Sequence, residues 1–279
     1  MNFKDKTVII TGGSEGVGAA TARAFAAAGA NLVLAARSKK KLERIADELR
    51  EKTRVEIFAM DVVDPDACVN LFKKAQFEFG SIHVLINNAG YHVRGPVETI
   101  ESDDLGKMID VNLKAPIVLS RLVLPYIRES GGGAIINVAS IAGRAPVAGA
   151  AAYCASKFGL RAFTFALADE IRGEPIKLGV VSPGPISTGF MMDNLESVLE
   201  VNFSQPISSA EEVAAEILKI CTDGKREKTM PPVSGILATM VYLFPWFGRL
   251  ARPLLERKGR EVKRKMIAEM HRKRQEGPS

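Results

Sequence analysis

The chain has 279 residues, 47% hydrophobic and 25% charged, a balance typical of a folded globular protein. The three cysteines, Cys68, Cys154 and Cys221, are widely spaced, and the three histidines lack metal-ligand spacing, so neither a disulfide framework nor a metal site is predicted. The net charge of +6 is concentrated in residues 249–279, which hold eleven Lys and Arg and four Glu. The rest of the chain is close to neutral, which argues against a general nucleic-acid-binding surface.

The first residues, MNFKDKTVIITGG, contain only a short apolar run before two glycines. This pattern is typical of a strand that enters a turn and not of a secretion signal. Together with the few, unpaired cysteines it predicts a cytoplasmic protein in a reducing compartment.

Strands and helices are predicted to alternate along the chain. Apolar runs predict strands at 7–11, 31–37, 55–61, 82–90, 133–140 and 176–184. Helical stretches follow at about 17–28, 39–52, 65–80, 102–129 and 153–172, and a further helix at 208–225 has Ser209 as its predicted N-cap and Glu212 at the third position. This alternation, with nearly continuous apolar strands, indicates an α/β fold with a doubly wound parallel sheet.

The glycine-rich stretch TGGSEGVG, residues 11–18, joins the first strand to the first helix. Gly12, Gly16 and Gly18 would allow a tight turn and let the backbone approach a pyrophosphate at the helix N-terminus. A purely structural turn is the alternative for a lone glycine pattern, and the spacing differs by one residue from G-x-G-x-x-G. The position between a strand and a helix favours dinucleotide binding.

Further motifs follow in order: Asp61 after the third strand, NNAG at 87–90, Asn112 in VNL, Ser140 in NVAS, YCASK at 153–157, and SPG at 182–184 with Thr188 beyond. With TGGSEGVG they make residues 5–224 resemble the short-chain dehydrogenases/reductases. The resemblance implies a Rossmann-type catalytic domain at 1–224, followed by a helical, basic C-terminal extension at 225–279. It also implies hydride transfer between a nicotinamide and an alcohol or ketone.

Tyr153 and Lys157 stand four residues apart, so a helix would place both on one face. An isolated pair of this kind is commonly structural, but in the family it is catalytic. A neighbouring ammonium stabilises phenolate and would lower the tyrosine pKa from about 10 toward neutral. The resemblance further implies that Ser140 donates a hydrogen bond to the substrate oxygen and that Asn112 holds a water that orients Lys157.

The resemblance also implies a set of cofactor contacts, in which Asp61 and Val62 meet the adenine. The predicted residues are Gly12, Ser14, Glu15, Gly16, Val17, Gly18, Arg37, Asp61, Val62, Asn88, Ala89, Gly90, Tyr153, Lys157, Pro183, Gly184, Ile186 and Thr188. Asn87 and Asn88 have a structural alternative, because side-chain amides often tie adjacent strands together.

The end of the second strand favours NADP(H) over NAD(H). Ala36 stands where an acidic residue would bind the ribose hydroxyls and repel a 2′-phosphate. The guanidinium of Arg37 can hold that phosphate through two hydrogen bonds. Residues 39–41 are three lysines that add positive potential, although they also fit a solvated helix start, and Glu15 opposes phosphate binding.

Residues 189–208 fall where the family has its substrate lid. Phe190, Met191, Met192 and Leu195 would form either an adaptable apolar wall or ordinary core. Because this segment offers few polar groups, we expect a lipophilic ketone or secondary alcohol as the substrate. A non-catalytic dinucleotide sensor or scaffold is the alternative, and the complete set of four catalytic residue types argues against it.

The extension contains twenty uncharged residues at 229–248, followed by a basic stretch. That length can span a bilayer, but three prolines and two glycines favour a segment that lies on a membrane surface. A pocket wall, a subunit contact and a solvated tail are the alternatives. Apolar residues near one face of the basic stretch favour peripheral membrane contact through 229–274. This character loosely resembles lipid-substrate members such as 3-ketosphinganine reductases, and the family implies a homodimer or homotetramer.

Overall fold

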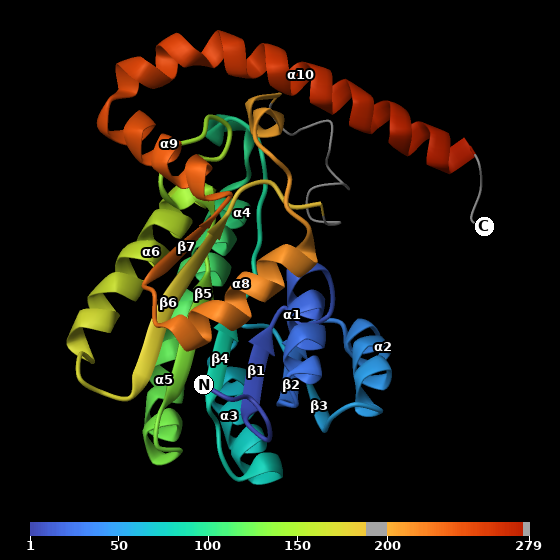
Figure 1. Cartoon of the computed structure of the whole chain (residues 1–279), viewed down its shortest axis with the longest axis vertical. Helices are drawn as coiled ribbons and strands as arrows, with labels where there is room; N and C mark the ends of the chain where they lie inside the picture. Colours follow the sequence, from blue (N-terminus) through green and yellow to red (C-terminus); the bar gives the residue numbers. More distant parts are fainter. Residues whose placement is uncertain (188–199, 276–279) are drawn as a thin grey trace.

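The computed structural model of the chain describes residues 1–187 and 200–275. Within them, parallel strands form one sheet in the order β3-β2-β1-β4-β5-β6-β7 (Figure 1). The strands are β1 (Thr7–Thr11), β2 (Asn31–Ala36), β3 (Val55–Ala59), β4 (Val84–Asn87), β5 (Gly133–Val138), β6 (Ile176–Pro183) and β7 (Glu227–Met230). The predicted doubly wound parallel sheet is confirmed.

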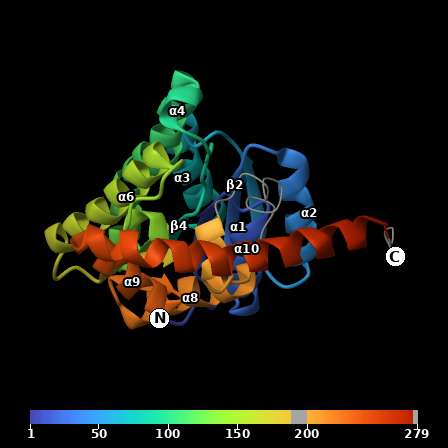
Figure 2. The same ribbon diagram turned by 90° about the horizontal axis from the view of Figure 1, so that it is seen from above.

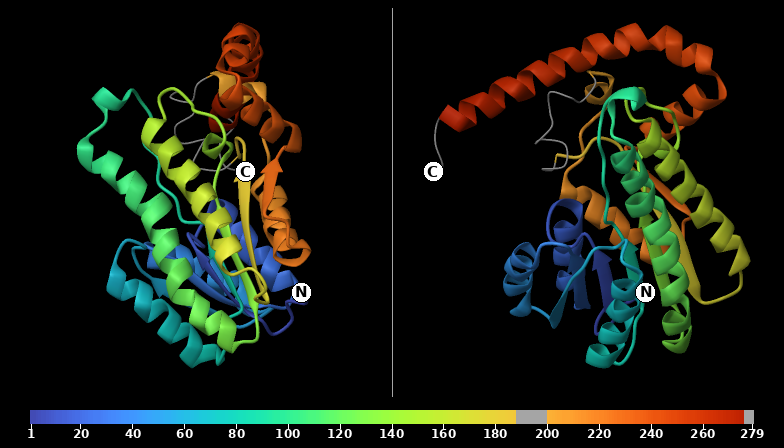
Figure 3. Two further views of the ribbon diagram at one scale, coloured as in Figure 1. Left: turned by 90° about the vertical axis from the view of Figure 1, so that its left-hand side faces the viewer. Right: turned by 180° about the vertical axis from the view of Figure 1, so that it is seen from behind.

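Helices cover both faces of the sheet (Figures 1 and 3). One face packs against α1 (Gly16–Ala27), α2 (Lys39–Arg50) and α8 (Ala210–Asp223), and the other packs against α3 (Pro65–Phe79), α5 (Ala115–Glu129) and α6 (Ala151–Glu170). The predicted helical region at 102–129 is divided, because a π-helical turn, η2 (Asp110–Lys114), separates α4 (Ser102–Ile109) from α5.

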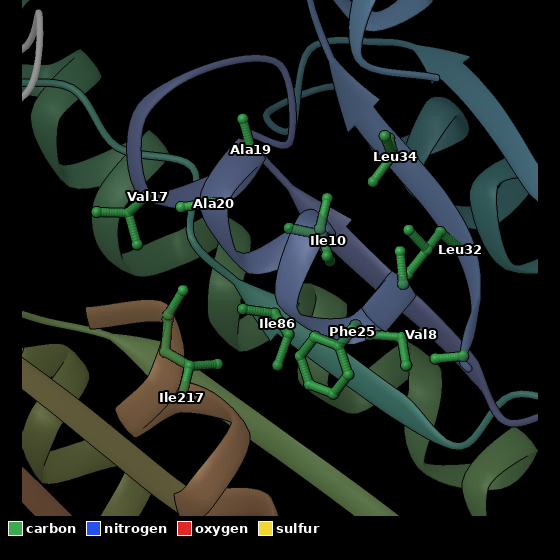
Figure 4. Close-up of a cluster of buried hydrophobic side chains, with 14 of the residues drawn as sticks. Val8, Ile10, Val17, Ala19, Ala20, Phe25, Leu32, Leu34, Ile86 and Ile217 are labelled. Carbon is green, nitrogen blue, oxygen red and sulfur yellow. The ribbon is translucent and has the colours of Figure 1, made fainter. Parts of the chain in front are cut away.

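Strand residues alternate between two hydrophobic cores, as the period of a β-strand requires. In β1, Val8 and Ile10 face the core under α1 and α8, while Ile9 faces the core under α3 and α5. Figure 4 shows the first core, where Phe25 and Ile217 meet the strands. Fully burying a side chain of this size contributes about 1.5–3 kcal/mol, so the two cores hold the strand ends in fixed positions.

Helix boundaries follow the predicted capping chemistry. The Ser209 hydroxyl accepts the Glu212 N–H at 3.0 Å, and the Glu212 carboxylate accepts the Ser209 N–H at 2.8 Å. This confirms the predicted capping box at the start of α8. The same helix ends at Gly224, whose φ of 68° is favourable for glycine.

The sheet continues beyond Gly224, where the sequence predicts a helical extension. β7 pairs in parallel with β6 and is followed by α9 (Pro232–Leu243) and α10 (Pro245–Gln275). The short and mostly polar sequence of β7, EKTM, has no strand-like pattern, which is why it was not predicted. α10 crosses the molecule above the sheet (Figure 2). In the described part of the chain, no helix is both long and apolar enough to cross a membrane.

Candidate active site

A cleft of about 810 Å³ opens at the carboxyl ends of the strands. Residues that end or follow the strands line it, including Gly12 after β1, Ala36 at the end of β2, Asn88 after β4 and Val138 at the end of β5. Open α/β sheets bind their ligands at this edge. The volume lies within the range of small-molecule and cofactor pockets, so the cleft is the candidate active site.

The glycine turn is built for a close approach to the cleft. Gly12 has a φ of +65°, and a Cβ there would lie 2.9 Å from Asn88 Nδ2. Gly18 lies behind the turn and does not line the cleft, since a Cβ at this position would be 2.0 Å from the Gly12 carbonyl oxygen. Glu15 is the N-cap of α1 and makes no side-chain capping bond, which leaves the first helical N–H groups to meet a phosphate. These features fit a dinucleotide pyrophosphate.

The asparagines of NNAG hold the turn and the sheet together. Asn88 Nδ2 donates to the carbonyl oxygens of Thr11 and Gly12, at 3.0 and 3.2 Å. Asn87 Nδ2 donates to Asn137 Oδ1 at 2.8 Å and ties β4 to β5. The structural interpretation therefore applies to both residues, and Asn88 lines the cleft in addition.

The adenosine end of the predicted cofactor site carries positive charge. Arg37 and Lys41 line the cleft beside Ala36. Lys41 Nζ lies 2.6 Å from Glu15 Oε2, so it compensates the carboxylate that was expected to weaken phosphate binding. Asp61 lines the same end, where its Oδ1 accepts the Val63 N–H.

At the other end of the cleft, α6 presents Tyr153 and Lys157 together. Lys157 Nζ lies 5.7 Å from the centroid of the Tyr153 ring and donates to the Val138 carbonyl at 3.0 Å. Lys157 is only 4% exposed, and burial lowers its pKa to about 8. Burial raises the pKa of Tyr153, while a hydrogen bond with the Ser140 side chain and the charge of Arg94 act in the opposite direction.

Burial is the largest of these effects on Tyr153, so the protein's own groups leave its pKa above the usual value. The spacing of Tyr153 and Lys157 predicts a lowered tyrosine pKa, and for the protein's own groups that prediction is wrong. Desolvation in the buried site disfavours the phenolate and the ammonium alike.

Asn112 is buried in the π-helical turn and does not line the cleft. Its Nδ2 donates to the Tyr91 carbonyl at 2.7 Å and to Ser156 Oγ at 3.2 Å, and its Oδ1 accepts the Tyr91 N–H at 2.8 Å. Asn112 therefore fixes the loop after β4. Its predicted water-holding role stays a prediction.

The loop after β4 also brings Tyr91, His92 and Arg94 into the cleft, and none of the three is among the residues predicted from the sequence. The His92 ring stacks on the Tyr153 ring with centroids 4.0 Å apart and an angle of 14°. Burial, with the charges of Arg94 and Lys157, lowers the pKa of His92 to about 3, so this ring is neutral. Arg94 is half-buried and lines the cleft beside them. Their position directly after NNAG, in a loop at the carboxyl edge of the sheet, was the available signal.

Most of the other predicted site residues meet in this cleft. Those that line it are Gly12, Ser14, Glu15, Gly16, Val17, Arg37, Asp61, Val62, Asn88, Ala89, Gly90, Ser140, Tyr153, Lys157, Pro183, Gly184 and Ile186. Thr188 and the proposed wall residues Phe190, Met191, Met192 and Leu195 lie outside the described residues. Gln205, from the described end of the predicted lid, also lines the cleft.

Residues 6–218 match the family described as short chain dehydrogenase, and the chain therefore belongs to the short-chain dehydrogenases/reductases. It is 42% identical over 189 residues to an uncharacterized oxidoreductase of Staphylococcus saprophyticus, covering 67% of this chain and 76% of that protein. It is 34% identical over 256 residues to the ketoacyl reductase HetN of Nostoc, covering 87% and 89%. The crystal structure of levodione reductase superposes with a TM-score of 0.76 at 28% identity, covering 81% of this chain and 95% of that one.

Family membership makes the chain an oxidoreductase that acts on carbonyl or alcohol groups with a nicotinamide dinucleotide. The non-catalytic sensor or scaffold considered as an alternative is not supported. The solved relative shares the Rossmann-type fold, in agreement with the sequence-based prediction.

Proposed function

We propose that the chain is an NADP(H)-dependent enzyme that interconverts a lipophilic ketone and its secondary alcohol. The observation that carries this proposal is the composition of one cleft. Ser140, Tyr153 and Lys157 meet at one end, and Arg37 stands at the end beyond the glycine turn. Ser140, Tyr153 and Lys157 are suited to proton transfer, and Arg37 is suited to binding a phosphate group.

The proton chemistry belongs to Tyr153. When bound, the nicotinamide supplies or accepts the hydride. In the reducing direction the Tyr153 hydroxyl donates its proton to the substrate oxygen, and in the oxidising direction the phenolate accepts it. Lys157, with a pKa of about 8, is protonated at neutral pH, and its charge then favours the phenolate. Ser140 hydrogen-bonds Tyr153 and is positioned to donate to the same substrate oxygen.

Preference for NADP(H) is supported by charge. No carboxylate stands at Ala36 to repel a 2′-phosphate, and the Arg37 guanidinium follows directly. Glu15, the acidic residue of the turn, is paired with Lys41. The positive charge of Arg37 is therefore left to a phosphate group of the cofactor.

A lipophilic substrate is supported by the cleft and by one relative. Ile141, Val147 and Ile186 contribute apolar side chains to the lining. HetN is named a ketoacyl reductase, and a match that covers 87% of this chain necessarily reaches beyond Gly224 into the C-terminal region. Arg94 adds a positive charge beside Tyr153, so the ketone that fits best carries an anionic group near its carbonyl.

Cofactor titration of Arg37→Ala tests the NADP(H) assignment. A lost charge-assisted contact of roughly 1.5–3 kcal/mol corresponds to about a 10- to 160-fold weaker affinity for NADPH, with little change for NADH. Lys40→Ala is the matched control, because Lys40 is exposed and does not line the cleft. Equal losses for both cofactors would show that Arg37 does not contact the 2′-phosphate.

The substrate class is tested by NADPH oxidation with ketones of increasing chain length, each offered with and without a carboxylate near the carbonyl. We expect kcat/KM to rise with chain length and to be higher for the carboxylate-bearing compounds. Arg94→Met should remove the second preference and retain the first. A panel in which only short, uncharged ketones react would contradict the proposal.

A further inference from the structure

α9 presents its apolar residues to solvent and its small or polar residues to the protein. Val233, Ile236, Leu237 and Met240 are 64%, 66%, 47% and 41% exposed. Their spacing of i, i+3, i+4 and i+7 places them on one face of the helix. Ser234, Gly235 and Ala238 are the buried residues of this helix. A surface helix of a soluble domain normally has the opposite arrangement.

The exposed apolar face continues from α9 into α10. Leu243 and Phe244 are 60% and 44% exposed, and Leu250 and Leu254 on α10 are 75% and 72% exposed. We call the exposed apolar side chains on these two helices the apolar face: Val233, Ile236, Leu237, Met240, Leu243, Phe244, Trp246, Leu250 and Leu254. Large contiguous apolar areas of this kind mark a site of interaction with another surface.

Positive charge follows directly on α10. Among the side chains of α10 that the structure describes, the exposed basic residues after the apolar face are Arg257, Lys258, Arg260, Arg264 and Lys265. Figures 1 and 2 show that α10 extends from its junction with α9 across the molecule, so the basic part of α10 continues the same helix that carries Leu250 and Leu254. An apolar area beside clustered cationic groups is typical of a surface that binds anionic lipid.

α9 is held rigidly on the catalytic domain. Arg144 Nη1 donates to the Gly235 carbonyl at 3.2 Å and to Thr239 Oγ1 at 2.8 Å. Gly235 lies against Thr229, where a Cβ would come within 2.4 Å of the Thr229 hydroxyl oxygen. α9 therefore cannot turn its apolar residues inward without breaking these contacts.

α10 is anchored beside the cleft. Phe203, in the 3₁₀ helix η5 (Glu200–Ser204), is 1% exposed and packs against Val262 and Met266. Gly259 lies against η5 as well, because a Cβ there would overlap the Glu200 carbonyl oxygen. α9 follows the carboxyl end of β7, so the apolar face lies at the same end of the sheet as the cleft (Figures 1 and 3).

We propose that the apolar face and the basic part of α10 dock the enzyme on the surface of an anionic phospholipid bilayer. The twelve residues of α9 are too short to cross a bilayer, but they suit insertion into one leaflet. A second copy of the chain is a poorer occupant. A two-fold interface pairs the same surface on both copies, so the basic residues beside the apolar face would gain no negatively charged partner. Docking of this kind is independent of the substrate and cofactor proposals.

The unaltered protein contains a natural fluorescent probe of lipid binding. Trp246 is the single tryptophan of the chain, stands at the start of α10 and is 59% exposed. On mixing with vesicles of phosphatidylcholine and phosphatidylglycerol, its fluorescence should shift to shorter wavelength, and lipids brominated near the headgroup should quench it. Vesicles of phosphatidylcholine alone should give a smaller change. Unchanged Trp246 emission at saturating anionic lipid would overturn the proposal.

Substitutions separate the apolar and the electrostatic contributions. The double variant Ile236→Glu, Met240→Glu should bind anionic vesicles at least tenfold more weakly in a sedimentation assay. Phe77→Glu is the matched control, because Phe77 on α3 is 85% exposed and lies outside the apolar face, so its binding should match that of the unaltered chain. Charge removal in R257Q/K258Q/R260Q should reduce binding to anionic vesicles, and R44Q/K52Q/K73Q, at exposed sites elsewhere, should not.

Salt and oligomeric state complete the test. Raising salt from about 0.1 M to about 0.5 M should release part of the bound protein, because charges on a surface are screened and apolar insertion is not. If the double variant instead converts an oligomer to a monomer and binds vesicles normally, a second copy occupies the face and the proposal is wrong. Circular dichroism checks that each variant is folded. If a variant does not fold, the Trp246 fluorescence of the unaltered protein decides whether the enzyme docks on lipid.

Discussion

α2 and α9 both contain twelve residues, yet they bury opposite kinds of side chain. α2 turns Leu42, Ile45, Ala46 and Leu49 into the core and its lysines and glutamates outward. α9 turns Ser234, Gly235 and Ala238 toward the protein and exposes its large apolar residues. The comparison shows that an apolar helix can belong to a fold without contributing to its core.

The difference has a local cause. α2 packs onto the broad apolar surface of β2 and β3, which admits leucine and isoleucine side chains. α9 packs close to β7 at Thr229, where there is no room for a Cβ at residue 235. Small residues are therefore required on the inner face of α9, and its large residues are left to the outside.

The largest effect of any substitution is expected for Tyr153→Phe in the cleft. The substitution keeps the stacked ring and removes the proton donor, so kcat should fall by about 10²- to 10⁴-fold while NADPH affinity changes little. The measurement is steady-state turnover together with cofactor titration. Tyr126→Phe, the same change at a residue of α5 that does not line the cleft, should leave kcat unchanged. Near-normal turnover by the Tyr153 variant would remove this residue from the proton-transfer step.

Glu227→Gln should weaken the attachment of β7 and α9 to the catalytic domain. The Glu227 carboxylate is 9% exposed, binds Arg144 and lies 3.0 Å from Arg161 Nε. Loss of its charge leaves two guanidinium groups poorly compensated, which should cost up to about 3–5 kcal/mol of unfolding free energy in urea denaturation. Glu174→Gln, at the exposed pair with Arg128, should cost much less than Glu227→Gln, because water and salt screen an exposed ion pair.

The same carboxylate gives a pH dependence with a defined sign. Burial would raise the pKa of Glu227, but hydrogen bonds from Arg144 and Arg161 hold it below its usual value. Its contribution is therefore present above the pKa of an unfolded glutamate, about 4.3, and is lost as the pH falls through the lowered folded-state value. The stability difference between Glu227→Gln and the unaltered chain should shrink in that acidic range. A difference that is independent of pH would contradict an ionic role for Glu227.

The direct comparison of the two helices uses the same truncation on each. Leu42→Ala in α2 removes a fully buried side chain and should cost about 2–5 kcal/mol of unfolding free energy. Ile236→Ala in α9 removes a side chain that is 66% exposed and should change it by no more than about 0.5 kcal/mol. Urea denaturation of both variants gives the two values. A large loss for Ile236→Ala would show that another chain covers this face in solution.

Residue patterns were sufficient to predict those features whose structure is set by residues close together in the sequence. The glycine turn, the capping box at Ser209 and the Tyr153–Lys157 pair were predictable, because each depends on spacing within one or two turns of chain. β7 was not predictable, because three polar residues and one methionine show no strand pattern, and the segment is held in the sheet by Glu227, which meets Arg144 and Arg161. His92 and Arg94 were missed for a related reason, because their contacts come from a loop that folds back toward α6.

By itself, the sequence determined the class of fold, the cleft at the strand ends and most of the residues that line it. Hydrophobic periodicity and ordered motifs carry that information locally. Only the tertiary structure decided that Asn112 serves the loop at Tyr91, that burial raises the pKa of Tyr153, and that α9 exposes its apolar side. Each of these properties depends on which distant groups surround a residue and on how much water those groups exclude. Neighbouring residues along the chain do not reveal either of these two factors.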